Sequence, residues 1–200
     1  MIETNTQKPT QRQGYKHMQF MSLLYVTFVL LTMMVENRIA FILHFKLLSG
    51  TLVLPLSYAM SDIITEVYGY QQMRRLVWQS IFILYICAAI ILIIMHLPEG
   101  SFQSKDAAYT QVFSYFLKDV VTYSISAAAS IFLNIYIISK WKTLTRGRYF
   151  WLRSLGSTAI GEALFILIWG FIGFSSEFNL STLLELMLTS YACKLIYNVF

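Results

Sequence analysis

Charged residues are scarce in this chain, and that scarcity excludes most soluble folds. Asp, Glu, Lys and Arg make up 12% of its 200 residues, while 57% of the residues are hydrophobic. A soluble domain carries roughly 25% charged residues, which it needs to cover a water-facing surface. The composition therefore predicts one compact integral membrane domain.

Residues that carry metal or catalytic chemistry are equally sparse. Two cysteines, Cys87 and Cys193, lie in apolar segments, and the three histidines are far apart. Neither a disulfide framework nor a clustered metal site fits that distribution. Sequence motifs for nucleotide binding, zinc proteases and serine hydrolases are missing. We expect no cofactor, no bound metal and no enzymatic activity.

What the chain does have is six apolar segments. A transmembrane helix needs about 20 mostly apolar residues. The predicted spans are Met18–His44, Leu52–Tyr68, Leu76–Leu97, Asp119–Ser139, Leu155–Phe174 and Thr182–Val199. The first apolar run is too long for a cleavable signal peptide. The predicted fold class is an all-α integral membrane protein, a six-transmembrane-helix bundle over residues 18–200 that follows a cytoplasmic tail over residues 1–17.

The loops between these spans predict the orientation of the bundle. Alternate connections carry only Lys46 and Lys105 as basic residues, apart from Lys118, which opens the fourth span with Asp119. The N-terminal tail and the other connections carry ten, namely Lys8, Arg12, Lys16, Arg74, Arg75, Lys140, Lys142, Arg146, Arg148 and Arg153. Basic loops stay in the cytoplasm, so both termini are expected there, in a cytoplasmic (inner) membrane. The basic charge is accounted for by topology, and no nucleic-acid partner is expected.

The second span contains the densest group of polar residues. Asp62 and Glu66 are four residues apart and therefore share one helix face, which Tyr58 extends. Two stacked carboxylates repel each other in a low dielectric unless a ligand, a cation or a shared proton lies between them. Contact with a ligand or proton is the favoured interpretation. Neutralisation in internal salt bridges with Arg38, Arg74 or Arg75 is the alternative.

Further candidate residues lie in other spans. Asn37 can both donate and accept hydrogen bonds, although an interhelical hydrogen bond would also explain it. Glu162 lies about two helical turns inside the fifth span, where a charge is costly and is a functional candidate by default. Lys194 in the sixth span is either a ligand contact or an anchor that snorkels to the interface. Trp78 is a candidate for stacking on a ring.

One stretch resembles a known family. Residues 62–70 read D-I-I-T-E-V-Y-G-Y and are followed by Arg74-Arg75-Leu76-Val77-Trp78. This pattern is similar to the queuosine precursor transporter family, also called the vitamin uptake transporter family. Supporting matches across the chain are Asn37, residues 142–148 with Trp151-Leu152-Arg153, Ser157-Thr158 with Gly161, and Lys194. The resemblance implies a six-helix domain similar to the substrate-binding subunits of energy-coupling-factor vitamin transporters.

The chain departs from the family pattern at several positions. Lys118 stands where the family usually has an Arg before the fourth span, and Ser130-Ile131 replaces a Gly-Gln pair within it. Phe165 aligns with an Asp that is common in the fifth span.

The resemblance also implies a substrate, namely 7-deazaguanine compounds that are taken up to make queuosine in tRNA. A guanine-type edge presents two parallel donors that one carboxylate can accept, beside an oxygen that needs a donor. Asn37, Asp62, Glu66, Glu162 and Lys194 offer such groups, with Tyr58 and Trp78 for stacking. A substrate-binding subunit for another vitamin or heterocycle is the alternative, and an intramembrane enzyme or a scaffold is disfavoured. The lipid bilayer is an expected partner, and the sequence does not decide between a chain that works alone, one with an energising subunit, and a homo-oligomer.

Overall fold

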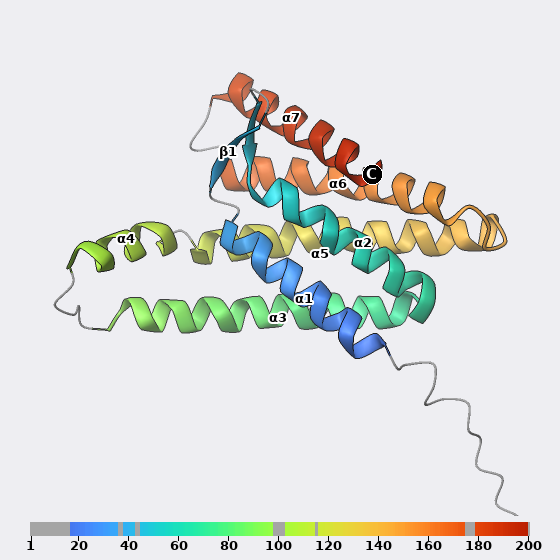
Figure 1. Ribbon diagram of the computed structural model, residues 1–200, viewed down its shortest axis with the longest axis horizontal. Coiled ribbons are helices and arrows are strands. Elements are labelled where there is room, and N and C mark those ends of the chain that lie inside the picture. Colours follow the sequence, from blue (N-terminus) through green and yellow to red (C-terminus); the bar gives the residue numbers. More distant parts are fainter. Residues whose placement is uncertain are drawn as a thin grey trace, which may run out of the picture.

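The computed structural model describes residues 17–35, 38–42, 45–97, 103–114, 116–174 and 179–199. This part of the chain forms seven helices and one antiparallel hairpin, whose strands are β1 (Ile39–Ile42) and β2 (Phe45–Leu48). The helices are α1 (Met18–Val35), α2 (Gly50–Tyr68), α3 (Tyr70–Met95), α4 (Gln103–Phe113), α5 (Phe116–Leu144), α6 (Phe150–Phe174) and α7 (Leu180–Val199). The six longer helices lie along one another as a bundle, and the short α4 extends from one end (Figure 1).

The prediction of a helical membrane bundle is confirmed, and the six longer helices correspond to the six predicted spans. Of the described helices, α1, α3, α5 and α6 are both long and apolar enough to cross a membrane. The other two, α2 and α7, have 19 and 20 residues. They are more polar because α2 carries Asp62 and Glu66 and α7 carries Glu185 and Lys194.

The predicted end of the first span is wrong. A helix over Met18–His44 was expected, but α1 ends at Val35 and the hairpin follows. The 18 residues of α1 already rise about 27 Å, which nearly crosses the hydrocarbon core. Arg38, whose side chain is exposed, directly precedes β1. The two strands, residues 39–42 and 45–48, are rich in Ile, Phe and Leu. They pair so that Ile39 lies opposite Leu48 and Ile42 lies opposite Phe45.

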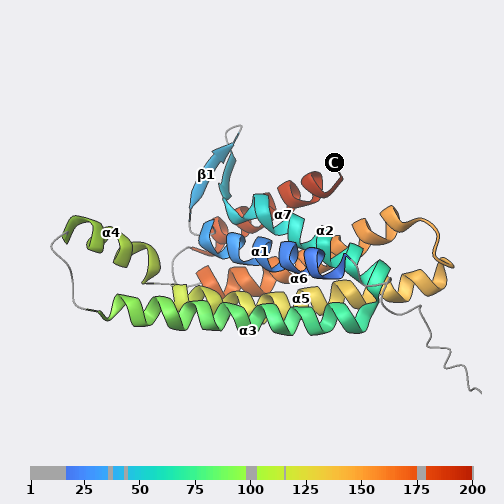
Figure 2. The same cartoon turned by 60° about the horizontal axis from the view of Figure 1, so that its bottom comes forward.

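The six longer helices alternate in direction, so their connections gather at two ends (Figures 1 and 2). One end, called the basic end below, holds the start of α1, the α2–α3 junction, the α5–α6 loop and the end of α7. It carries Arg74, Arg75, Lys140, Lys142, Arg146 and Arg148. The opposite end holds the hairpin, α4 and the start of α7 (Figure 2). The first helix thus starts, and the last helix ends, on the same side of the bundle, as an even number of spans requires.

Helix α2 is the central helix of the bundle. It contacts α1, α3, α5, α6 and α7. Ten of its residues are buried, among them the polar Ser57, Ser61, Asp62 and Thr65. The helix ends at Gly69, whose φ of +89° is a conformation that only glycine adopts without strain, and α3 begins at the next residue. The polar stripe seen in the sequence therefore faces protein, not lipid.

Close approach of α6 to its neighbours depends on Gly161. A Cβ atom built on this residue would lie 3.1 Å from the Ser130 backbone oxygen, 3.2 Å from the Asn134 Cβ and 3.3 Å from the Tyr58 ring. The first two contacts come from α5, and the third from α2. Backbone atoms of a packed helix cannot easily move aside. Gly161 is thus the residue that lets α2, α5 and α6 meet.

We predict that Gly161→Ala lowers the free energy of unfolding by about 1–3 kcal/mol, the usual cost of overpacking a core. Gly173→Ala on the same helix is the matched control, because its Cβ would meet only the Thr122 methyl at an ordinary 3.6 Å. Denaturant titration of both variants in detergent micelles measures the difference. Equal stability of the two variants would contradict the packing argument.

Candidate functional site

Asp62 is held by donors from three helices. Its Oδ1 accepts a hydrogen bond from Asn134 Nδ2 of α5 at 2.6 Å. Its Oδ2 accepts from two residues of α6, Ser154 Oγ at 2.5 Å and Thr158 Oγ1 at 3.1 Å. Ser61 Oγ lies 3.5 Å from Oδ1. Asp62 itself is only 1% exposed, and no Lys or Arg of the described residues forms an ion pair with it.

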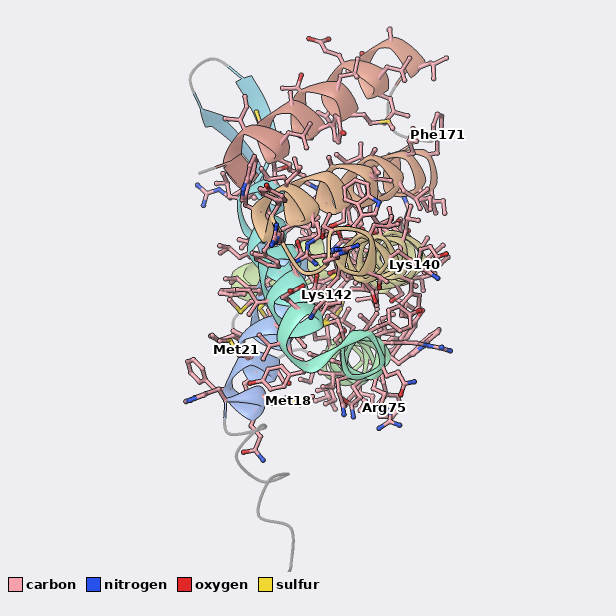
Figure 3. All side chains as sticks on the ribbon, turned by 90° about the vertical axis from the view of Figure 1, so that its right-hand side faces the viewer. Met18, Met21, Arg75, Lys140, Lys142 and Phe171 are labelled. Carbon is pink, nitrogen blue, oxygen red and sulfur yellow. The ribbon has the colours of Figure 1, made fainter. Side chains whose placement is uncertain are left out.

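Glu66 lies one turn further along α2, at the basic end, and is paired with cations. Arg153 donates to its two carboxylate oxygens from Nη1 and Nη2, each at 3.1 Å. Lys142 forms a second ion pair at 3.5 Å and also donates to the Glu66 backbone oxygen at 2.8 Å. The guanidinium of Arg153 is almost fully buried and donates from Nε to the Arg148 carbonyl. Figure 3 looks at this end, where Lys142 points from α5 toward the end of α2.

The alternative prediction was that Asp62 and Glu66 are neutralised in internal salt bridges. It holds for Glu66 and not for Asp62, and the cations differ from those predicted. Glu66 is neutralised in an internal salt bridge, but by Arg153 and Lys142. Arg38, Arg74 and Arg75 have exposed side chains. Asp62 has hydroxyl and amide partners in place of a cation. The two acids share a helix face but have separate environments, and their mutual repulsion is relieved by these partners.

A second carboxylate–cation pair lies inside the bundle. Lys194 Nζ of α7 is 3.3 Å from Glu162 Oε2 of α6. Glu162 is fully buried and Lys194 is 4% exposed. Because Lys194 is directed inward to a carboxylate, the alternative that it snorkels to the interface as an anchor is wrong. Such a pair stays buried only because each charge compensates the other.

Aromatic rings surround this pair. Lys194 Nζ lies 4.9 Å from the centroid of the Phe165 ring, a cation–π geometry. Phe165 stacks on Trp169 with centroids 6.3 Å apart and meets Tyr123 edge-on at 5.7 Å. All three rings are buried. The ammonium of Lys194 thus lies over Phe165, one ring of a buried aromatic cluster that also includes Trp169 and Tyr123.

Unused hydrogen-bonding capacity is concentrated near the same helices. Glu162 Oε1, Asn134 Oδ1 and Ser190 Oγ are buried and have no hydrogen-bond partner among the described residues. Tyr58 donates from its hydroxyl to Ser130 Oγ at 2.9 Å, and its ring lies beside Gly161, the neighbour of Glu162. Buried polar groups without partners are costly and mark a place where a ligand or water can bind.

The structure places the predicted site residues in different surroundings. Tyr58, Asp62, Glu162 and Lys194 are all buried on the inner faces of α2, α6 and α7. Glu66 is engaged at the basic end, as described above. Trp78 is 54% exposed and packs on Phe132, with centroids 5.5 Å apart, so it is not brought to the others. Asn37 lies outside the described residues.

Four partner residues were not among the predicted site residues. Arg153 was interpreted as a topology signal and as part of the family resemblance, and Asn134, Ser154 and Thr158 all donate to Asp62. The spacing of Ser154 and Thr158, four residues apart on one face of a predicted span, is the signal that could have found them. Among the described residues, no three His, Cys, Asp or Glu side chains gather so as to hold a metal ion.

Two surface cavities lie away from this cluster. One, of about 780 Å³, lies between α1 and α3, and the other, of about 200 Å³, lies between α6 and α7. The second is lined by apolar residues such as Ile166 and Leu184, together with Tyr191, whose hydroxyl donates to the Ala159 carbonyl at 3.2 Å. Neither is lined by Tyr58, Asp62, Glu162 or Lys194.

Comparison with known families decides the class of the protein. Residues 49–200 match the family model described as "Putative vitamin uptake transporter". This region includes α2 to α7 and all of the buried polar cluster. The chain belongs to this vitamin uptake transporter family. No curated protein and no solved structure gave a match. The resemblance read from residues 62–70 is confirmed at the level of the family.

We predict that Asp62→Asn destabilises this transporter family member. The new amide would place an N–H₂ group against donors from α5 or α6, and each buried polar group left unpaired costs about 1–3 kcal/mol. Glu185→Gln, the same chemical change at an exposed position of α7, should shift stability by less than about 0.5 kcal/mol. Thermal unfolding of both purified variants compares them, and an unaltered Asp62→Asn midpoint would contradict the assignment.

Proposed function

We propose that this chain imports queuosine precursors across the cytoplasmic membrane for the modification of tRNA. The substrates are 7-deazaguanine compounds, such as 7-cyano- or 7-aminomethyl-7-deazaguanine. Membership of an uptake family supports the transporter class, and the D-I-I-T-E-V-Y-G-Y run supports the substrate. The observation that carries the proposal is the buried Glu162–Lys194 pair beside Phe165.

The chemistry of that pair matches a guanine-type edge. A carboxylate can accept the N1–H and the exocyclic amine together, and an ammonium can donate to the adjacent carbonyl oxygen. Glu162 and Lys194 hold these two complementary groups 3.3 Å apart. On this proposal the two side chains neutralise each other in the empty carrier and turn to the ligand when it binds. A ligand that lacks either function would leave a buried charge unpaired, which discriminates strongly.

Tyr58 and Asp62 support this site in different ways. Tyr58 is buried beside Gly161 and offers a ring face. Asp62 uses its acceptor capacity on donors from α2, α5 and α6, so its role in the proposal is to set the positions of these helices. Glu66 is already paired with Arg153 and Lys142. Two free carboxylates at positions 62 and 66 would favour the cationic aminomethyl compound, but both side chains already have partners, so the proposal includes no such preference.

The function is tested by queuosine salvage. In cells that cannot make deazaguanine and lack their own importer, expression of this chain should restore queuosine in tRNA when a low concentration of one precursor is supplied. Each compound is fed separately, and modified tRNA is quantified. If no compound restores queuosine while the protein is present in the membrane, the substrate proposal fails. Uptake of another vitamin, as the family description allows, then takes its place.

Variants of the pair locate the site within the same assay. Glu162→Gln should reduce queuosine formation at least about tenfold, since a lost charge-assisted hydrogen bond costs about 1.5–3 kcal/mol. The double variant Glu162→Gln with Lys194→Met removes both buried charges, so it should insert normally and still fail to transport. Glu185→Gln is the control for a distant carboxylate. Normal uptake by the double variant would show that the substrate binds elsewhere.

The orientation is also part of the proposal, with the basic end in the cytoplasm. In a background without Cys87 and Cys193, single cysteines at Leu144, Leu97 and Asn179 provide exposed probes. We expect a membrane-impermeant thiol reagent added outside intact cells to label positions 97 and 179 but not 144, because basic loops are retained inside. The reverse pattern would invert the orientation.

A further inference from the structure

The groove between α1 and α3 is a surface cavity that the transport proposal does not use. Its volume is about 780 Å³, and most of its lining is apolar, including Leu23, Val26, Leu76 and Phe82. Leu23 and Phe82 are each 67% exposed. The groove is formed by the outer faces of two membrane-spanning helices, so its natural occupant comes from the bilayer.

The groove occupies one leaflet of the membrane, on the side of the basic end. Its α1 lining starts at Met18, the first residue of that helix. Its α3 lining runs from Leu76 to Ile83, which lies about 20 Å from the start of the helix at Tyr70. Half of the hydrocarbon core measures about 15 Å. The depth of the groove therefore corresponds to one acyl chain and not to a membrane-spanning partner.

Three polar side chains lie among the apolar ones. Gln19 and Ser22 of α1 and Gln79 of α3 line the groove. Gln19 and Gln79 are exposed. An amide that faces hydrocarbon without a partner is unfavourable, because lipid tails offer no hydrogen bonds. The ester carbonyls of a phospholipid accept hydrogen bonds and lie at the boundary between head group and chains. They would satisfy the amide and hydroxyl donors while the chain covers Leu23 and Phe82.

Positive charge marks the mouth of the groove. Arg75 directly precedes Leu76 and is one helical turn from Gln79, so it shares the face of α3 that lines the groove. Its side chain is exposed. In Figure 3, Arg75 of α3 and Met18 of α1 lie along the same lower edge of the basic end, while Lys140 lies at a different edge. Basic pockets between membrane helices on the cytoplasmic side bind anionic head groups.

We propose that this groove binds an anionic phospholipid. The phosphate pairs with Arg75, the ester groups accept from Gln19, Ser22 and Gln79, and one acyl chain fills the apolar part. The bound lipid bridges α1 to α3 along the stretch where the groove separates them. This site is independent of the substrate, because it involves none of the residues of the buried cluster.

Lipid titration of the purified protein tests this site. Phosphatidylglycerol and phosphatidylcholine with identical chains are added in detergent, and bound lipid is counted by native mass spectrometry. We expect one phosphatidylglycerol to be retained in preference to phosphatidylcholine. Arg75→Gln should weaken that binding about fivefold, the usual contribution of one basic residue near an anionic membrane. Lys140→Gln, the same charge change elsewhere at this end, should leave it unaltered.

A second variant separates the groove from general surface charge. Leu23→Trp fills the groove from an exposed position and should remove the retained lipid without altering the fold, as near-native thermal unfolding would confirm. Equal retention of both lipids, or equal loss in Arg75→Gln and Lys140→Gln, would overturn the proposal. A protein dimer that Leu23→Trp dissociates, with no lipid retained, would assign the groove to a second copy of the chain and would also overturn it.

Discussion

The buried carboxylate of Asp62 sets the arrangement of the helices around it. An acidic side chain that is 1% exposed in the middle of a membrane bundle must have donors on both oxygens. Asn134 of α5 and Ser154 and Thr158 of α6 provide them. Their positions fix the rotation of each helix about its own axis. Gly161 then allows the backbones to approach closely enough for these hydrogen bonds to form.

The surroundings of the other two carboxylates, Glu66 and Glu162, follow from that central arrangement. With Asp62 directed at α5 and α6, Glu66 one turn later emerges at the basic end, where the start of α6 brings Arg153 to it. Glu162 lies two turns beyond Ser154 on α6 and meets Lys194 of α7 deep in the bundle. Asp62 is thus paired with neutral donors, and Glu162 with the single ammonium of Lys194. Glu66 is paired with the guanidinium of Arg153 and with Lys142. Of these three arrangements, only the one at Glu162 leaves its carboxylate oxygens, Oε1 and Oε2, without a hydrogen bond among the described residues, and of the two only Oε2 lies in the ion pair with Lys194.

Much of this fold could be predicted from sequence because the bilayer imposes simple rules. Apolar length predicted the six longer helices, and the spacing of residues 58, 62 and 66 predicted that these side chains share one helix face. The partners of these side chains could not be predicted. Spacing along one helix defines a face, but it does not tell which of the five other long helices lies opposite. Arg153 was therefore interpreted as a loop charge and a family match, and not as the partner of Glu66. The outward position of Trp78 was missed for the same reason, since it depends on neighbours in space.

The departures from the family pattern acquire meaning once they are placed in three dimensions. Ser130, where the family pattern has glycine, accepts the hydroxyl of Tyr58 and so fixes the ring next to Gly161. Phe165, where an aspartate is common, presents its ring to Lys194. An aspartate there would give Lys194 a second carboxylate and add a negative charge beside Glu162. With phenylalanine, Lys194 has Glu162 as its carboxylate partner in the described part of the chain, and the surroundings of the pair become more apolar.

On the proposed function, both changes alter the wall of the substrate site rather than its charged centre. On this proposal, the chain would therefore differ from its relatives in how it recognises the ring of the substrate and its substituent, more than in how it recognises the guanine-type edge.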